Sequence, residues 1–276
     1  IWDIGIASPA HHEGRTVRPW RLPVIRVNIL GVIGVNPLLW ISGILGWVYP
    51  DVCQACRTQA TTSSNGYVCS NCRRAIRFIR PPFCERCGLP FEGNLTSPFE
   101  CSNCSNLELH FDAARSAVLA RGLVLQVLRR YKYQQAVWFE QFLADLLIHA
   151  AIPAVTACDW DLIMPVPLHP VREREREFNQ AARLARHLSR ATGIPIDRGC
   201  LQRIRPTQTQ TLLTREQRLR NLRGAFALGS RTAVSGLSCV VVDDVLTTGA
   251  TTSACARALK EGGARKVCVW TVARGV

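Results

Sequence analysis

The sequence lacks the two most familiar phosphate-binding fingerprints. It has no G-x-x-x-x-G-K-[ST] pattern, which excludes a P-loop, and no G-x-G-x-x-G opens a helix after a strand, which excludes the dinucleotide fingerprint. Acidic residues are also scarce, because 20 Asp and Glu stand against 34 Lys and Arg and give a formal net charge of +14. This excess predicts a polyanionic partner such as nucleic acid, anionic lipid or a phosphorylated metabolite.

The positive charge is uneven, with a basic run between residues 198 and 223 that contains a single acid, Glu216. The run is either a solvated helix face or a surface that faces phosphate or nucleic acid. It lacks the interleaved aromatic residues that stack single-stranded bases. Its arginines are Arg198, Arg203, Arg205, Arg215, Arg218, Arg220 and Arg223.

No small-residue cleavage site precedes the cysteines, so a secretory signal peptide is not expected and the protein is predicted to be cytoplasmic. The apolar segment 28–50 follows four arginines, which resembles the charge asymmetry of an inserted segment. However, Asn36-Pro37 interrupts it, and only 37–48 has the pattern of one amphipathic helix. Ordinary packing or disorder of 28–50 is favoured over membrane contact or a membrane span.

Eight of the thirteen cysteines form four C-x-x-C pairs. Twelve residues separate the first two pairs and thirteen separate the last two, which is the spacing of four-thiolate zinc ribbons. A two-residue gap forms a tight knuckle that aims both sulfurs at one ion, and two knuckles complete a tetrahedron. The predicted ligands are Cys53, Cys56, Cys69, Cys72, Cys84, Cys87, Cys101 and Cys104.

These pairs predict two structural Zn²⁺ sites without an open coordination position. Disulfides and an iron–sulfur cluster are the less favoured alternatives, and the ligands are shared between the two sites either sequentially or by interleaving. Eight thiolates and two Zn²⁺ would lower the net charge to about +10. The other cysteines are predicted to be core residues. They are Cys158, Cys200, Cys239, Cys255 and Cys268.

Past Cys104 the pattern becomes that of an α/β domain. Apolar residues recur at helical spacing over 120–151, and later segments alternate between short apolar runs and helical patterns. Strand, loop, helix, glycine and strand in this order form a βαβ unit, which predicts a parallel sheet flanked by helices. The later elements are a strand in 161–169, a helix over 179–193 that ends at Gly193, a strand at 237–244, a helix over 250–263 and a strand at 266–274.

The motif VVVDDVLTTGATT, residues 240–252, carries the most specific chemistry. Ligands of parallel sheets bind beyond the carboxyl ends of the strands, which is where Asp243 and Asp244 fall. The hydroxyl-rich loop after them opens a helix, and its backbone N–H groups form a cradle for phosphate. Two carboxylates beside a phosphate suit neutral vicinal hydroxyls or a bridging Mg²⁺, so the motif predicts a ribose 5-phosphate site.

This motif closely resembles the phosphoribosyl pyrophosphate-binding motif of type I phosphoribosyltransferases. The wider chain resembles the ComF family, competence-associated proteins that couple a double zinc ribbon to a phosphoribosyltransferase-like domain. The resemblance covers about residues 48–276, and its landmarks are the four cysteine pairs, YKY at 131–133, PVPLH at 165–169, REFNQAARLA, RPTQTQTLL, RLRNLRGAF and the aspartate motif. It implies a double zinc ribbon at 51–108 and a phosphoribosyltransferase-like domain at 109–276, after an extension at 1–50.

The resemblance also implies roles for individual residues. Asp243 and Asp244, the predicted catalytic pair, contact the ribose hydroxyls and hold Mg²⁺ through water. Lys132, Arg176 and the loop 165–169 are weaker candidates for the pyrophosphate side, where Glu177 stands in place of the family's usual glycine. The 5-phosphate contacts are implied for Thr247, Thr248, Gly249, Ala250 and Thr251.

Two functions of different class follow from this resemblance. The first is binding of phosphoribosyl pyrophosphate with Mg²⁺, with transfer to an unknown acceptor, in a protein of DNA uptake during natural competence. The second is a non-catalytic adaptor that binds single-stranded DNA beside a DNA-translocating helicase.

Overall fold

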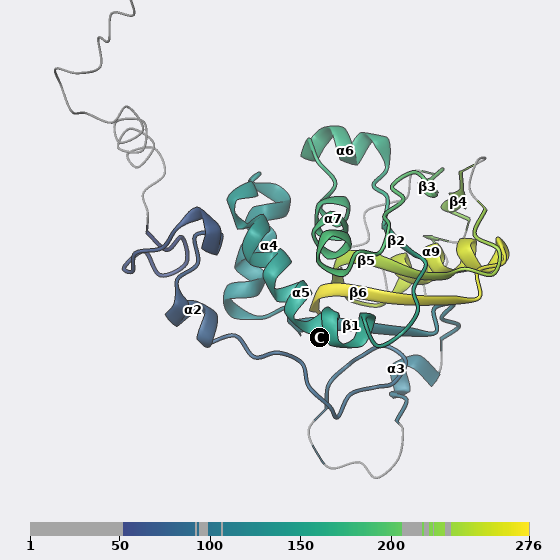
Figure 1. Cartoon of the computed structure of the whole chain (residues 1–276), viewed down its shortest axis with the longest axis horizontal. Helices are drawn as coiled ribbons and strands as arrows, with labels where there is room; N and C mark the ends of the chain where they lie inside the picture. The colour runs from purple at the N-terminus through teal and green to yellow at the C-terminus, as the bar shows by residue number, and fades with distance from the viewer. Residues whose placement is uncertain are drawn as a thin grey trace, which may run out of the picture. The chain divides into compact units, whose positions relative to one another are not determined.

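Figure 1 shows the computed structural model of the 276-residue chain. The structure describes residues 52–91, 93, 99–105, 107–205, 217, 221–222, 224–229 and 233–275. The chain divides into two units, 1–49 and 50–276, and the described residues belong to the second unit. The predicted apolar segment 28–50 and most of the basic run beyond Arg205 lie outside the described residues. Within the described part, no helix is both long enough and apolar enough to cross a membrane.

A four-stranded parallel sheet lies at the centre, in the order β1-β6-β5-β2. The predicted parallel sheet is therefore confirmed, and its three predicted strands are present. The fourth, β1, was not predicted, because an Arg and a Ser interrupt its small apolar residues and hide a strand pattern. The strands are β1 Ala113–Leu119, β2 Leu162–Pro165, β5 Ser238–Leu246 and β6 Lys266–Arg274.

The sheet has a hydrophobic core on each face. Successive side chains of a strand point to opposite faces, so Val240 and Val242 of β5 join one core while Cys239 and Val241 join the other. Helices α5 and α7 cover the first face, and α9 covers the second. Burial on both sides explains why residues 239–242 of this strand form an uninterrupted apolar run.

Helices connect the strands much as the sequence predicts. The long helical pattern at 120–151 is two helices, because the chain turns at Gln134–Ala136 between them. Asn179 caps α7 by accepting a hydrogen bond from the amide of Ala182 (3.1 Å), and Gly193 ends this helix. The helical elements are α4 Gly122–Tyr133, η3 Val137–Phe139, α5 Glu140–Val155, α6 Pro170–Arg176, α7 Gln180–Thr192 and α9 Ala250–Glu261. A small antiparallel pair, β3 Leu201–Arg203 and β4 Phe226–Leu228, packs against α9.

The cysteine pairs form two small ribbons that pack on opposite faces of the sheet. The first ribbon, residues 52–80, contributes Val68 to the core beneath α5 and α7, and its Arg73 pairs with Asp145 of α5 at 3.0 Å. The second ribbon, residues 83–104, places all four of its cysteines in the core beneath α9. Short helical turns in these ribbons are η2 Ser63–Asn65, α2 Ser70–Arg74 and α3 Ser102–Ser105.

The five remaining cysteines differ from the prediction at one position. Cys200, Cys239, Cys255 and Cys268 are buried, as predicted for core residues. Cys158 is exposed, so its assignment to the core was wrong. It lies in the turn that follows α5, where the chain has left the apolar face of the helix.

Candidate functional site

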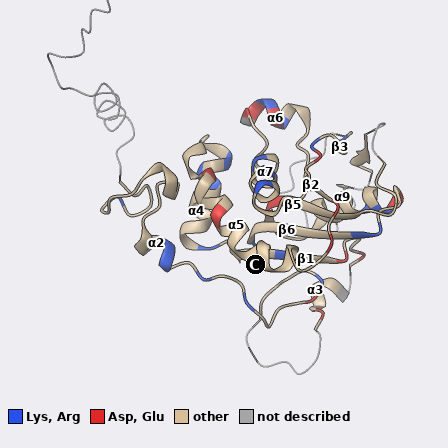
Figure 2. Cartoon of the chain, viewed as in Figure 1, with Lys and Arg blue, Asp and Glu red and all other residues tan. Residues whose placement is uncertain are grey.

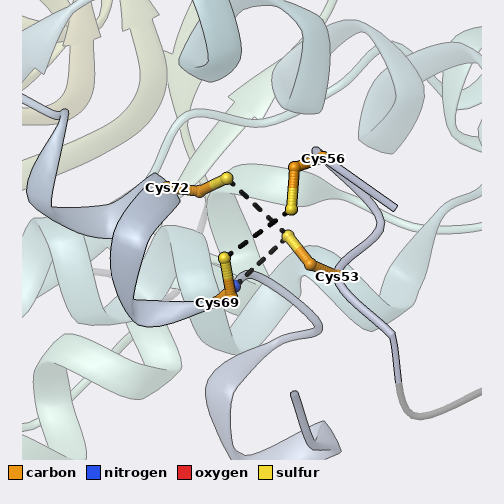
Figure 3. A group of neighbouring side chains, drawn as sticks. All are labelled: Cys53, Cys56, Cys69 and Cys72. Atoms are coloured by element: carbon orange, nitrogen blue, oxygen red, sulfur yellow. Dashed lines mark hydrogen bonds between the residues drawn. The ribbon is translucent and has the colours of Figure 1, made fainter. Parts of the chain in front are cut away.

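The first four cysteines converge on one point (Figure 3). Their ligand atoms lie within 4.8 Å of one another, with Sγ–Sγ distances of 3.8 Å for Cys53–Cys72 and 3.8 Å for Cys56–Cys69. Four sulfurs at the usual Zn–S distance of about 2.3 Å from a tetrahedral ion are separated by about 3.8 Å. The backbone amide of Cys69 also donates to Cys53 Sγ (3.3 Å), as in the outer shell of a metal site.

The second group repeats this geometry in a fully buried setting. Its Sγ–Sγ distances are 3.9 Å for Cys84–Cys104, 3.7 Å for Cys87–Cys101 and 3.6 Å for Cys101–Cys104. Both groups therefore fit a tetrahedral Zn²⁺. Each group consists of two consecutive cysteine pairs, so the ligands are shared sequentially and not by interleaving.

The predicted ribose-binding carboxylates lie at the carboxyl end of β5. Asp243 is partly exposed, whereas Asp244 is almost fully buried. Lys132, from the last turn of α4, places its Nζ 2.8 Å from Asp244 Oδ2. The structure thus brings a residue predicted for the pyrophosphate side into direct contact with the aspartate pair.

Asp243 is a strongly perturbed carboxyl group. Burial raises its pKa, the adjacent charge of Asp244 raises it further, and Lys132 opposes the rise, leaving a pKa of about 7. The amide of Asp244 donates to Asp243 Oδ1 (2.8 Å) and fixes the orientation of that carboxyl group. Perturbed carboxyl groups of this kind are typical of functional sites.

The loop after β5 opens helix α9, as the sequence predicts. Gly249 adopts a left-handed conformation (φ +78°) as the N-cap of α9. Thr248 Oγ1 accepts from the amide of Ala250 (3.3 Å), and the Gly249 carbonyl accepts from Ser253 N (2.8 Å). The amide-rich start of a twelve-residue helix therefore lies beyond the two aspartates, where a phosphate would gain from the helix dipole.

The predicted pyrophosphate side lies between α4 and α6. Lys132 and Arg172 line one pocket of about 320 Å³, together with Tyr133, Gln134, Gln135 and Glu175. Arg172 was not predicted, and its signal was only its position three residues after the 165–169 loop in an arginine-rich segment. Arg176 is the last residue of α6, and its side chain lies outside the described residues.

The other predicted features of this side are Glu177 and the loop 165–169. Glu177 caps the C-terminus of α6 with φ +62°, a left-handed conformation that favours glycine. The loop 165–169 is tied to both neighbours, since Val166 N donates to Val242 O (2.9 Å) and Asn179 Nδ2 donates to Val166 O (3.1 Å). Asn179 thus holds the start of this loop, a contact that its helix-cap pattern alone did not reveal.

Taken together, the carboxyl edge of the sheet offers two carboxylates, a paired lysine, a second cation and a helix N-terminus. Carboxylates accept hydrogen bonds from sugar hydroxyls, and the helix start and the cations suit phosphate groups. The arrangement can hold a molecule that is polyanionic at its ends and rich in hydroxyls in between.

The chain is similar to a known family model and to known proteins. Residues 44–106 match the family model described as a double zinc ribbon domain. The chain is similar to competence protein F of Haemophilus influenzae, with 31% identity over 228 residues that cover 80% of this chain and 96% of the relative. It is also similar to DNA utilization protein YhgH of Salmonella typhi, with 33% identity over 228 residues that cover 82% of this chain and 97% of the relative.

The comparison with solved structures also returns the glutamine phosphoribosylpyrophosphate amidotransferase of B. subtilis complexed with ADP and GMP. The identity is 25% and the TM-score is 0.31. The match covers 46% of this chain and 24% of the amidotransferase chain, so it concerns about a quarter of that enzyme's length.

Proposed function

The chain belongs to the ComF family of competence and DNA utilization proteins, and from this premise we propose that the carboxyl edge of its sheet binds phosphoribosyl pyrophosphate, or a related ribose 5-phosphate, with Mg²⁺. The observation that carries the proposal is the pairing of Asp243 and Asp244 with a helix-opening hydroxyl loop at the end of one parallel strand. Lys132, in contact with Asp244, adds the cation that a polyanionic sugar requires.

Each group has a distinct part in this binding. The 5-phosphate lies in the Thr247–Thr251 loop, and the carboxylates of Asp243 and Asp244 accept hydrogen bonds from the 2- and 3-hydroxyls. Asp243 and Asp244 would hold Mg²⁺ through water, and the ion would supply positive charge to the pyrophosphate. Lys132 and Arg172, which share one pocket, meet the pyrophosphate group.

The same residues support pentosyl transfer to an acceptor nucleophile. In that reaction the bond between C1 and pyrophosphate breaks while positive charge grows on the ribose, and a new bond forms from the acceptor to C1. The protein's task is mainly to position the reactants and to stabilise the departing pyrophosphate with cations. The names of the relatives, competence protein and DNA utilization protein, support a role for this binding or transfer in DNA uptake during competence.

Calorimetric titration of the zinc-loaded full chain with phosphoribosyl pyrophosphate and Mg²⁺ tests the site. Wild type should bind, and Asp243→Asn/Asp244→Asn should lose at least roughly tenfold in affinity, because two charge-assisted contacts are removed. Asp159→Asn, which changes an exposed aspartate in the loop after α5, is the control and should bind like wild type. Absence of binding by the folded, zinc-loaded wild type would refute the proposal.

A second function, contact with single-stranded DNA, is favoured by the charge of the first ribbon. Residues 52–84 contain five arginines and no acidic residue, and Figure 2 shows basic positions without acidic ones along α2 and the chain after it. Four thiolates and one Zn²⁺ reduce this charge from +5 to about +3. Arg57, Arg74, Arg77 and Arg80 are exposed.

This basic surface borders a pocket of about 620 Å³ between the first ribbon and α4, lined by Arg77, Arg121 and apolar side chains such as Leu119 and Leu123. An apolar floor with a cationic rim suits an unstacked base and its phosphate. Arg74→Gln/Arg77→Gln should weaken binding of a labelled single-stranded oligonucleotide and flatten its salt dependence. Arg190→Gln/Arg257→Gln removes equal charge elsewhere, and equal loss in both double variants would refute this location.

We also propose a cytoplasmic location. The support is chemical, because eight cysteines grouped as two sets of zinc ligands require reduced thiols, which a reducing compartment maintains.

A further inference from the structure

A buried arginine connects the second cysteine cluster to the loop proposed to hold the 5-phosphate. Arg274 is the last residue of β6 and is 2% exposed. Its Nη1 donates to the carbonyl oxygens of Leu246 (2.9 Å), the last residue of β5, and Thr247 (2.6 Å), the first residue of the loop. Its Nη2 donates to Cys87 Sγ at 3.7 Å. One guanidinium group thus contacts a zinc ligand and the phosphate loop.

The positive charge of Arg274 makes its contact with the zinc-loaded cluster strong. Transfer of a guanidinium group into a protein interior is costly unless it is compensated by hydrogen bonds and by negative charge. Four thiolates around one Zn²⁺ carry a net charge of about −2, so the zinc-loaded cluster supplies that negative charge through Cys87. Hydrogen bonds to metal-bound sulfur are also the usual means by which outer residues orient a ligand.

Apolar side chains also connect the second ribbon to the phosphate loop. Leu109 and Phe111 leave the second ribbon and share its core with Leu246 and Ala250 on either side of the loop. A Cβ atom placed on Gly249 would lie 3.5 Å from the Phe111 ring, which shows how closely the ring approaches the loop. His110 N also donates to Ser253 Oγ in the first turn of α9 (3.1 Å). The first ribbon packs on the opposite face of the sheet and belongs to the other core.

We propose that Arg274 is a positioning residue, through which Zn²⁺ in the second ribbon holds the phosphate loop in its binding conformation. This inference rests on the proposed function, because the loop is taken to be a phosphate site. It makes the two zinc sites unequal, since Arg274 couples the second of them directly to the phosphate loop. Coupling is reciprocal, so ligand binding must also retain Zn²⁺ in the second ribbon.

The experiment uses the zinc-loaded full chain and follows zinc release to a chromophoric chelator, with and without phosphoribosyl pyrophosphate and Mg²⁺. Alkylation and peptide mass mapping identify which cysteines are freed. In wild type, the ligand should slow release from Cys84, Cys87, Cys101 and Cys104 by about tenfold and leave the first cluster unaffected. In Arg274→Met, this protection should be lost and ligand affinity should fall by about tenfold.

Two further variants separate positioning from general stability. Arg274→Lys keeps a cation and should restore part of the protection. Arg115→Met removes an arginine of β1 that contacts Glu85 of the second ribbon, and it should behave like wild type. Retention of affinity and protection in Arg274→Met would overturn the inference.

Hydrogen exchange at residues 247–251 tests the connection without any ligand. Removal of Zn²⁺ from the second ribbon should increase exchange there in wild type, and Arg274→Met should show the same increase while still loaded. If wild type fails to bind phosphoribosyl pyrophosphate but shows this increase, the proposed function fails and the connection stands. Unchanged exchange on zinc removal would refute the connection.

Discussion

The carboxyl group of Asp243 is the residue whose ionisation should control ligand binding. Burial and the neighbouring Asp244 raise its pKa to about 7, so a large part of it is protonated at neutral pH. The ionised form accepts stronger, charge-assisted hydrogen bonds from the hydroxyls and contacts hydrated Mg²⁺ with full charge. The affinity for a ribose phosphate should therefore rise as the pH increases through about 7.

Between pH 6 and pH 8, the ionised fraction of a group with a pKa of about 7 grows by about tenfold, and the affinity should grow in proportion. Calorimetry across this range measures the change in affinity. The same titration of Asp243→Asn is the control, because the phosphate of the ligand titrates equally in both experiments. A wild-type profile no steeper than that of Asp243→Asn would contradict this role.

Glu177 occupies a backbone conformation that suits glycine. Its φ of +62° costs a non-glycine residue roughly 1 kcal/mol, so Glu177→Gly should stabilise the fold by about 0.5 kcal/mol once the flexibility of glycine in the unfolded chain is counted. Thermal unfolding should show Tm rising by about 1–2 °C. The matched control is Glu173→Gly inside α6, which should lower stability by about 1 kcal/mol. A lower Tm for Glu177→Gly would show that its side chain contributes more than its backbone costs.

These single residues differ in how far the sequence alone predicts their roles. The cysteine ligands and the aspartate pair follow from local spacing, because their chemistry requires neighbours in the chain. The contact of Lys132 with Asp244 spans more than a hundred residues, and no local pattern contains it. Cys158 was misplaced for a related reason, since an apolar neighbourhood in the sequence does not reveal where a helix leaves the core.

At the scale of elements, one ion network holds α5 against α7. Glu140 accepts from Arg183 Nη1 (2.6 Å) and contacts His187 Nε2 at 2.9 Å. Burial opposes its ionisation, but the hydrogen bonds from His187 and Arg183 prevail and lower the pKa of Glu140 to about 2. A depressed carboxyl pKa contributes stability above the unfolded value of about 4.3, and this contribution is lost as the pH falls toward 2.

Glu140→Gln should therefore lower the free energy of unfolding by about 2 kcal/mol at neutral pH. The difference from wild type should shrink as the pH falls below about 4. Chemical denaturation at several pH values measures it. If the free energy of unfolding of Glu140→Gln stays below that of wild type by a constant amount down to pH 3, the variant has lost packing and not charge.

The elements themselves were predicted where one periodicity dominates. Strands β5 and β6 and helix α7 carry clear patterns, and their predicted positions are confirmed to within a few residues. Polar residues interrupt β1, and β3 and β4 are only three residues long each, so pairing with a partner strand defines these strands. The break between α4 and α5 was also not predicted, because apolar spacing continues on both sides of it.

At the scale of the whole molecule, the sheet arranges three separate regions around one function. The ends of β5 and β2 and the last turn of α4 meet at the carboxyl edge. The two ribbons pack on opposite faces, so that one lies beside the proposed phosphate loop and the other presents a basic surface. Sequence spacing predicted two ribbons, but only the alternation of side chains across the sheet assigns each of them to a face.

The most direct test of the central claim compares two sugars that differ by one hydroxyl. Ribose 5-phosphate and 2-deoxyribose 5-phosphate are titrated, each with Mg²⁺, into the zinc-loaded full chain. If the aspartate pair accepts hydrogen bonds from vicinal hydroxyls, loss of the 2-hydroxyl should weaken binding by about tenfold, because a buried carboxylate loses a partner. Equal affinities for the two sugars would contradict the assignment of Asp243 and Asp244 to the ribose.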